Sequence, residues 1–472
     1  MRKLGGLACG GCARGGGVRR GWGIGLAVCL AFGCGVEQET SELEDTSAPL
    51  EEEARPHPGA TRWVRTVRDT VFGFALAVDK RDNTFLSLTY ETGRVDLGGG
   101  ALPGSQGLGL AKLSPDGRHL WSKGFPTTGG RLPFVRALAV DGAGNLYVTG
   151  EHSEGALSLG GVPLPAGAFV AKFAPEGGHR WSRTWTHQGQ SLRPTALALD
   201  ERSGQVVLAG HVEDGASGHD GAVLGRLRMD DGTGDAPRAL AVSGAPGVTG
   251  LAVDPAGHLA VVGAWSGTVD LGGGPLTTPL FTTPFVARYS PEGRHLWSRG
   301  LNGAEGSATG VAATGSRIVV VGQYTGGFSF RGRPQLADEQ DAFVLTYQST
   351  GEERWAHHFA WSAGAVAVDH QNRVVVVGQY QPGDSAGGAR LPFRSAEDFQ
   401  DNHVFVTKLD RSTGAHVWSR GLFSSVVLRA RSLAVTRGGE SSVLGNFESE
   451  ADFGTGPVSV PTDSAVLLRL GK

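Results

Sequence analysis

From residue 61 to its end, the chain is built of seven related units of about 60 residues each. Every unit opens with a short aliphatic run, and these runs end at Asp79, Asp141, Asp200, Asp254, Thr314, Asp369 and Thr436. The spacings between the run ends are 62, 59, 54, 60, 55 and 67 residues. A repeated unit of this size cannot bury its apolar face alone, and its length suits a four-stranded blade. The repeat therefore predicts a β-propeller.

Each unit contains four strand-like pieces that are separated by turn residues. In the second unit these pieces are residues 137–141, 146–150, 168–173 and 179–183. The sequence Asp-Gly-Ala-Gly-Asn at 141–145 is typical of a hairpin turn. Pro-Glu-Gly at 175–177 is another turn, because proline presets φ and glycine accepts a positive φ. Helical periodicity is nowhere sustained, so we predict an all-β fold with four-stranded antiparallel blades.

The fourth strand of most units carries a tryptophan, which indicates how the ring closes. These residues are Trp121, Trp181, Trp297, Trp355 and Trp418. The third unit lacks the tryptophan, and the seventh has no fourth strand because the chain stops after 464–470. The segment 61–65, with Trp63, stands before the first unit and fits the missing strand. Pairing of this N-terminal segment with the last unit would remove two open sheet edges. We therefore predict a seven-bladed propeller over residues 61–472 whose last blade the Trp63 strand completes.

The repeat resembles that of bacterial SBBP-type (seven-bladed β-propeller) repeat proteins, an exported group with little assigned function. The matching motifs are Phe-Val-Ala-Lys at 169–172, Phe-Val-Ala-Arg at 285–288, the Gly-Gly-Gly segments and the Trp-Ser-Arg/Lys endings. One stretch, 409–418, is also similar to the tryptophan-docking repeat of quinoprotein-like propellers. That second group includes cofactor-dependent dehydrogenases and an outer-membrane assembly lipoprotein. The likeness is clear in one blade, so it supports the fold, and we predict no cofactor.

Residues 1–34 have the pattern of a signal peptide. Five basic residues precede position 21, no acid occurs before Glu37, and residues 22–33 form an apolar run too short to span a bilayer. The run ends in Leu-Ala-Phe-Gly-Cys34, which resembles a bacterial lipobox. We therefore predict cleavage before Cys34 and its lipidation, since two or more acyl chains anchor a protein stably. An ordinary secretory signal cut nearby is the alternative.

The residues that follow predict an exported protein tethered to the envelope. Residues 35–60 carry eight acids and one base, cannot bury a core and should form a solvated, disordered tether. Gly35 after the cysteine implies, by the sorting rule of lipoprotein families, the outer membrane, facing either the periplasm or the exterior. The protein would contact the membrane through its N-terminal lipid alone. All four cysteines precede residue 35, so residues 61–472 form no disulfide and no thiolate metal site.

Three recurrent polar or aromatic residues are best interpreted as structural. His119, His179, His295 and His416 each lie two residues before a tryptophan. The geometry disfavours a metal ring, because fourth strands lie roughly 14 Å outside first strands and Zn–N bonds need about 2.1 Å. We expect these histidines to pack on their own blade, and the tryptophans to pack between blades. Asp96, Asp270 and Asp452 precede Gly-rich segments and should cap turns instead of binding Ca²⁺.

No catalytic motif stands out, and residues 61–472 contain nearly equal numbers of acids and bases, which argues against nucleic-acid binding. The longest loop, 381–402, carries charged and aromatic groups that interfaces favour: Arg390, Phe393, Arg394, Asp398 and Phe399. We therefore predict a monomeric, non-enzymatic scaffold that binds an envelope protein or a glycan. The alternatives are envelope-assembly scaffolding and a propeller enzyme, either a quinoprotein-like oxidoreductase or a carbohydrate-active hydrolase or lyase.

Overall fold

The computed structural model describes residues 57–68, 71–91, 95–128, 131–212, 221–392, 403–424 and 428–472. The chain divides into two units, Met1–Ala54 and Arg55–Lys472, and every described residue belongs to the second. The predicted signal peptide, Cys34 and residues 35–56 of the predicted tether lie outside the described residues. Among the residues described, no helix is long and apolar enough to cross a membrane.

The described residues form antiparallel sheets that follow one another along the chain, as the sequence predicts. The first contains β2 (Val71–Val78), β3 (Thr84–Tyr90), β4 (Gly107–Leu113) and β5 (His119–Pro126). The second contains β6 (Phe134–Val140), β7 (Leu146–His152), β8 (Gly167–Phe173) and β9 (His179–Thr184). The third contains β10 (Thr186–His187), β11 (Gln190–Asp200), β12 (Gln205–Val212), β13 (Ala222–Arg228) and β14 (Arg238–Ala239).

The fourth and fifth sheets have longer second and third strands. The fourth contains β15 (Gly247–Val253), β16 (Leu259–Asp270), β17 (Pro275–Tyr289) and β18 (His295–Gly300). The fifth contains β19 (Ala304–Ala313), β20 (Arg317–Phe330), β21 (Arg333–Gln348) and β22 (Glu353–Phe359). Each pairs its strands in chain order, as hairpin connections require.

The sixth and seventh units share one eight-stranded sheet. It contains β23 (Ser362–Val368), β24 (Val374–Tyr380), β25 (His403–Leu409), β26 (His416–Ser424), β27 (Leu428–Val435), β28 (Ser441–Asp452), β29 (Pro457–Leu470) and β1 (Thr61–Val67). Among the described residues, the short pairing of β26 with β28 provides the hydrogen-bonded link between the two halves. Strand β1 pairs antiparallel with β29, with Trp63 opposite Arg469. The N-terminal strand is therefore the fourth strand of the last unit, as predicted.

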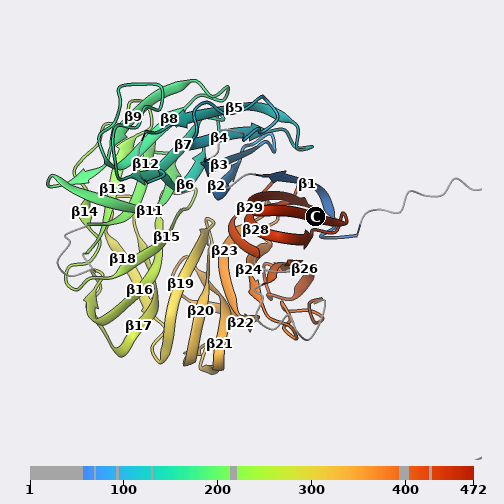
Figure 1. The fold of residues 1–472 in the computed structure, drawn as a ribbon. Helices are drawn as coiled ribbons and strands as arrows, with labels where there is room; N and C mark the ends of the chain where they lie inside the picture. Colours follow the sequence, from blue (N-terminus) through green and yellow to red (C-terminus); the bar gives the residue numbers. More distant parts are fainter. Residues whose placement is uncertain are drawn as a thin grey trace, which may run out of the picture. The chain divides into compact units, whose positions relative to one another are not determined.

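The first strands of the seven units form a closed circle. Successive contacts run from β2 through β6, β11, β15, β19 and β23 to β27, and β27 contacts β2. Figure 1 shows these strands toward the centre, with the later strands of each sheet farther out. Sheets that radiate from such a circle form a β-propeller, which matches the predicted fold class. The first-to-second and third-to-fourth strand turns lie on one face, which we call the turn face.

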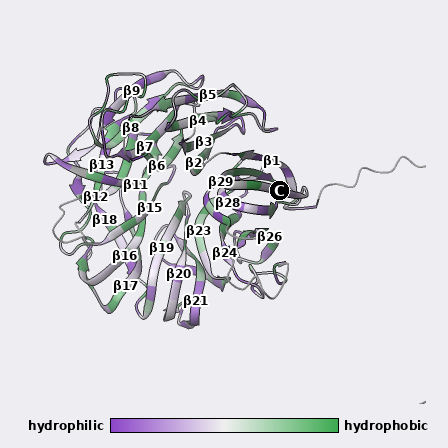
Figure 2. Cartoon of the chain, viewed as in Figure 1, coloured by the Kyte–Doolittle hydropathy of each residue, from purple (hydrophilic) through white to green (hydrophobic). Residues whose placement is uncertain are grey.

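The core lies between neighbouring sheets. Strands β3 and β4 are buried along their whole length, and hydrophobic residues run through the strands of every sheet (Figure 2). Phe85 and Leu110 of the first sheet pack in one cluster with Leu146 and Phe169 of the second. Because each sheet buries both faces against its neighbours, closing the ring leaves no terminal sheet without a partner.

Every first strand carries a β-bulge at the same place, and in six units a glycine of the second strand faces it. The bulged residues are Phe74, Arg136, Thr195, Thr249, Thr309, Gly364 and Arg431. In the sixth unit Gly378 pairs with Ala363, and a Cβ on Gly378 would overlap the carbonyl oxygen of Ser362. Glycine is required there because the bulge brings the two backbones together.

Gly378→Ala should therefore lower the free energy of unfolding by about 1 to 3 kcal/mol, because the added methyl group forces the backbone to shift. Gly364→Ala, in the paired strand, is the matched control. A Cβ on Gly364 would meet nothing closer than the Val377 carbonyl oxygen at 3.8 Å. That change should stay within about 0.5 kcal/mol. Urea unfolding measures both variants, and equal losses would contradict the close approach.

Candidate functional site

The acid that ends the first strand makes a buried ion pair with the third strand of its own unit. In the sixth unit Lys408 Nζ lies 3.1 Å from Asp369 Oδ2, and both side chains are fully buried. Asp369 also accepts hydrogen bonds from the backbone N–H groups of Gln371 and Arg373 in the following turn. Burial alone would raise the pKa of Asp369, but the hydrogen bonds outweigh it and hold that pKa below its ordinary value.

The same pairing occurs in the first and fourth units. Asp79 pairs with Lys112 at 3.2 Å, and Asp254 pairs with Arg288. In the fifth unit both positions are threonine, Thr314 and Thr346. The seventh unit also has a threonine in place of the acid, Thr436, but it keeps a buried cation, Arg469, which pairs instead with Glu440 at 3.5 Å.

The fourth-strand tryptophans join each unit to the next one on the turn face. The indole N–H of Trp121 donates to the Pro175 carbonyl at 2.9 Å, and its ring lies against Gly177 of that turn. Trp63, Trp181, Trp297 and Trp355 donate in the same way to Pro115, Met229, Ser349 and Arg411. The ring of Trp418 lies against Gly59. The predicted role of tryptophan in packing between units is confirmed.

The recurrent histidines and aspartates also have the predicted structural roles. His119 lies against Gly98 and Gly99 of its own unit and shares a hydrogen bond with Ser122 at 3.1 Å. His179, His295 and His416 lie against the equivalent glycines. Asp96 Oδ1 accepts from the backbone of Gly98 and Gly100, and Asp270 and Asp452 cap their own Gly-rich turns.

The third unit departs from this pattern at its fourth strand. Strand β14 has only two residues and pairs Leu224 with Arg238. The same antiparallel register places Ala236 opposite Arg226, where Trp121 stands opposite Lys112 in the first unit. Ala236 is exposed. A Cβ on Gly293, in the facing turn of the fourth unit, would meet nothing within 4 Å. One tryptophan-docking position of the ring is therefore vacant.

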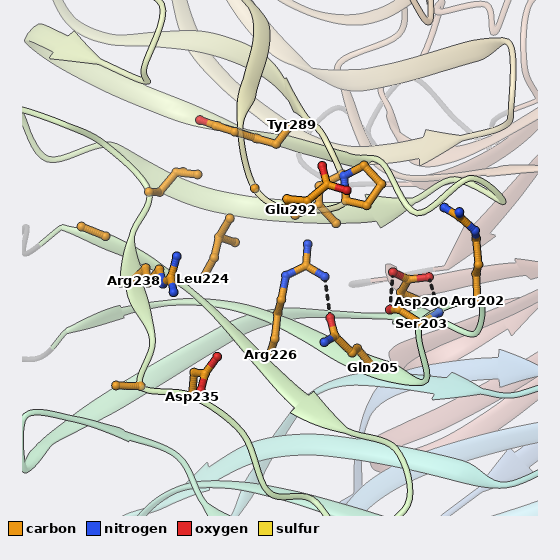
Figure 3. A pocket seen from close by; sticks show the side chains of 16 residues that line it. Asp200, Arg202, Ser203, Gln205, Leu224, Arg226, Asp235, Arg238, Tyr289 and Glu292 are labelled. Atoms are coloured by element: carbon orange, nitrogen blue, oxygen red, sulfur yellow. Dashed lines mark hydrogen bonds between the residues drawn. The ribbon is translucent and has the colours of Figure 1, made fainter.

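A cavity of about 620 Å³ occupies the vacant position between the third and fourth sheets. Figure 3 shows Leu224 and Arg226 of β13 on one wall and Tyr289 and Glu292 of the fourth unit on the other. Its volume lies within the range of ordinary ligand pockets, and an apolar floor with a few polar groups is typical of them. The cavity adjoins the turns, so it opens on the turn face.

Arg226 differs from Lys112, Arg288 and Lys408, because its guanidinium group makes no ion pair with the acid that ends the first strand of its unit. Its Nη1 donates to Gln205 Oε1 at 2.7 Å, whereas Asp200 Oδ2 accepts from the Ser203 hydroxyl at 2.6 Å. The Nη2 atom is buried and has no hydrogen-bond partner among the described residues. Burial lowers the pKa of Arg226, although arginine remains charged at neutral pH.

The residues predicted for the binding loop are placed only in part. Arg390 is exposed and forms an isolated bridge with Ser385. Phe393, Arg394, Asp398 and Phe399 lie outside the described residues, as does Cys34. The binding loop therefore stays a prediction. Sequence reasoning missed the cavity on the turn face, although its one available signal, the absent tryptophan of the third unit, is visible in the repeat.

The loop face opposite the turns has a smaller cavity of about 340 Å³ between the second and third sheets. It is lined by residues of the connections at 125–136 and 185–194, including Arg131, Phe134 and Arg193. Arg136 and Arg193 both pair with Glu151 at its rim. This cavity does not correspond to a tryptophan-docking position, so the repeat gives no indication of its ligand.

Comparisons with known proteins do not identify a family. No protein-family model matches the sequence, and no curated protein matches it. Among solved structures, the Dos1 propeller is 8% identical with a TM-score of 0.44, covering 87% of this chain and 96% of its own. Hydrazine synthase of Kuenenia stuttgartiensis is 10% identical with a TM-score of 0.43, covering 84% and 95%. Quinohemoprotein alcohol dehydrogenase from Comamonas testosteroni is 10% identical with a TM-score of 0.39, covering 88% and 76%. These likenesses are too weak to bear on function, and the fold assignment rests on the strand pairing.

Proposed function

We propose that this chain is a non-enzymatic binding scaffold, held at the cell envelope, whose turn-face cavity binds another envelope protein. The observation that carries the proposal is the vacant tryptophan position between the third and fourth sheets. Six units use a tryptophan to fill the corresponding space, and the third unit leaves Gly293 uncovered. A preformed cavity lined by Leu224, Leu259 and Tyr289 together with charged side chains suits a protein anchor residue.

The architecture of the scaffold is part of the proposal. We take the ring to have seven blades, one for each sequence unit. The circle of seven first strands and the pairing of β1 with β29 support this number. The resemblance to SBBP-type repeat proteins is consistent with it and remains a proposal, because it rests on the motifs of the sequence.

The proposed cellular location of the scaffold rests on the N-terminal sequence. The basic, apolar and cysteine-containing pattern of residues 1–34 supports export and lipidation at Cys34, with the outer membrane as destination. The eight acids between positions 37 and 53 would keep the segment that precedes the propeller solvated. A propeller on such a tether can reach partners beyond the membrane surface.

Affinity capture from native envelope extract tests the function with four forms of the full mature chain. The wild type should capture a partner, and Ala236→Trp should lose it, because the introduced indole fills the cavity. Replacement of residues 381–402 by a short Gly-Ser link should leave capture intact. Ala236→Ser is the matched control, since it changes the same position without filling the space.

Each result of the capture bears on a distinct part of the proposal. Retention of the partner by Ala236→Trp would remove the cavity from the interface. Loss of the partner only when residues 381–402 are replaced would place the interface on the long loop instead. Capture of nothing by any form would contradict stable protein binding, and glycan binding would then be measured with the same four proteins.

A further inference from the structure

We infer that the turn-face cavity receives an indole ring, presented as a tryptophan side chain by the bound protein. This inference rests on the proposed function, because it assumes that the cavity is the binding site. It goes further in naming the chemical group that the cavity recognises. The chain docks its own indoles in the same way at the six equivalent boundaries.

The boundary between the fourth and fifth units shows what such a docking position contains. Trp297 donates its indole N–H to the Ser349 carbonyl at 3.0 Å, and its ring lies against Gly351, which has φ of 87°. The ring of Tyr347 lies 5.7 Å from the Trp297 ring, between centroids. The docking position thus combines a carbonyl that accepts the indole N–H, a glycine whose lack of a side chain leaves room for the ring, and an aromatic side chain beside the ring.

The vacant boundary keeps all three of these features. Gly293 has φ of 83° and takes the place of Gly351, and Tyr289 stands where the fifth unit has Tyr347. The Pro291 carbonyl corresponds to that of Ser349, and no described residue donates a hydrogen bond to it. The tryptophan is missing while its surroundings remain, so the cavity is complementary to an indole with a free N–H.

The vacant position also resembles an occupied one in having a cation next to the place of the indole. Arg469 lies over the ring of Trp63, with its guanidinium carbon 5.6 Å from the centroid. Arg226 occupies the equivalent place in the third unit, opposite the tryptophan position. An indole in the cavity would therefore lie within reach of a cation–π contact with Arg226.

The rim favours an indole carried by a polypeptide. Arg238 and Asp235, of opposite charge, are both exposed at the cavity, with Glu292 on the facing turn. Mixed charges of this kind suit the polar main chain and neighbouring side chains of a peptide, whereas a free anion would favour a uniformly basic site. Tryptophan is also one of the three residue types enriched among the anchors of protein interfaces.

Ligand-observed NMR titration tests the inference with N-acetyl-L-tryptophanamide as the probe. The full mature wild-type protein and Ala236→Ser should bind it, and Ala236→Trp should bind it at least tenfold more weakly. The 1-methylindole analogue of the probe should bind the wild type up to about tenfold more weakly, because it cannot donate to the Pro291 carbonyl. N-acetyl-L-phenylalaninamide should also bind more weakly. Circular dichroism confirms that each variant is folded.

Three results would overturn the inference. In the first, the wild type does not bind the probe. In the second, Ala236→Trp binds it as tightly as the wild type does, and in the third, free indole binds the wild type more tightly than the amide does. Free indole binding more tightly would assign the cavity to a small molecule instead of a protein-borne side chain. A partner captured by the wild type and lost in Ala236→Trp, without probe binding, would leave the scaffold function standing and remove only the indole.

Discussion

Replacing Asp369 with alanine should lower the free energy of unfolding by about 3 to 5 kcal/mol, because it leaves Lys408 charged and unpaired in the interior. Both side chains are fully buried, so water cannot screen the unpaired charge that the substitution leaves on Lys408. Burial already lowers the pKa of Lys408, and removal of its acid partner would lower that pKa further. Urea unfolding monitored by tryptophan fluorescence measures the loss.

The fifth unit supplies the control for this prediction. Its threonines at the two positions indicate that a unit folds without either charge, so Asp369→Thr combined with Lys408→Thr should recover most of the lost stability. Replacement of a buried ion pair by uncharged residues is often neutral. A double variant as unstable as the sum of the two single variants would contradict the pairing.

Trp297→Ala should lower the free energy of unfolding by about 3 to 5 kcal/mol, because it empties the docking position between the fourth and fifth units. Trp297 is 8% exposed and packs in one cluster with Tyr347 and Val320 of the next sheet. The variant reproduces at this boundary the vacancy found between the third and fourth sheets.

Trp297→Phe separates packing from hydrogen bonding at the same position. It keeps an aromatic ring but loses the N–H that donates to the Ser349 carbonyl, so it should cost about 1 kcal/mol beyond the lost contact area. Thermal and urea unfolding of both variants give the comparison. A loss below about 1 kcal/mol for Trp297→Ala would show that tryptophan does not join the units.

The repeat was sufficient to predict the fold because its turn and strand chemistry recurs in every unit. The run ends such as Asp79 and Asp369 mark the first turns, and Trp63 before the first unit indicated the pairing of β1 with β29. What the repeat did not reveal was the partner of each strand-end acid. That partner, Lys408 for Asp369, stands on a strand far along the unit, and only the sheet register brings the two together.

The cavity could not be predicted because it is defined by what a neighbouring unit leaves uncovered. The missing tryptophan of the third unit is visible in the sequence, but its position is held by Ala236, which lies outside the two-residue strand β14. The facing Gly293 belongs to the next unit. The vacant position can be recognised only when the turn of the fourth unit that faces Ala236 is known. Loop length is visible in the sequence, and it indicated residues 381–402 instead.

Hydrogen–deuterium exchange on the complex with the captured partner tests most directly that the turn-face cavity is the binding site. The account predicts that the partner slows exchange in residues 200–205, 235–240 and 289–293, which border the cavity. Residues 381–402 should exchange as they do in the free protein. Slowed exchange confined to 381–402, with the cavity borders unchanged, would contradict the account.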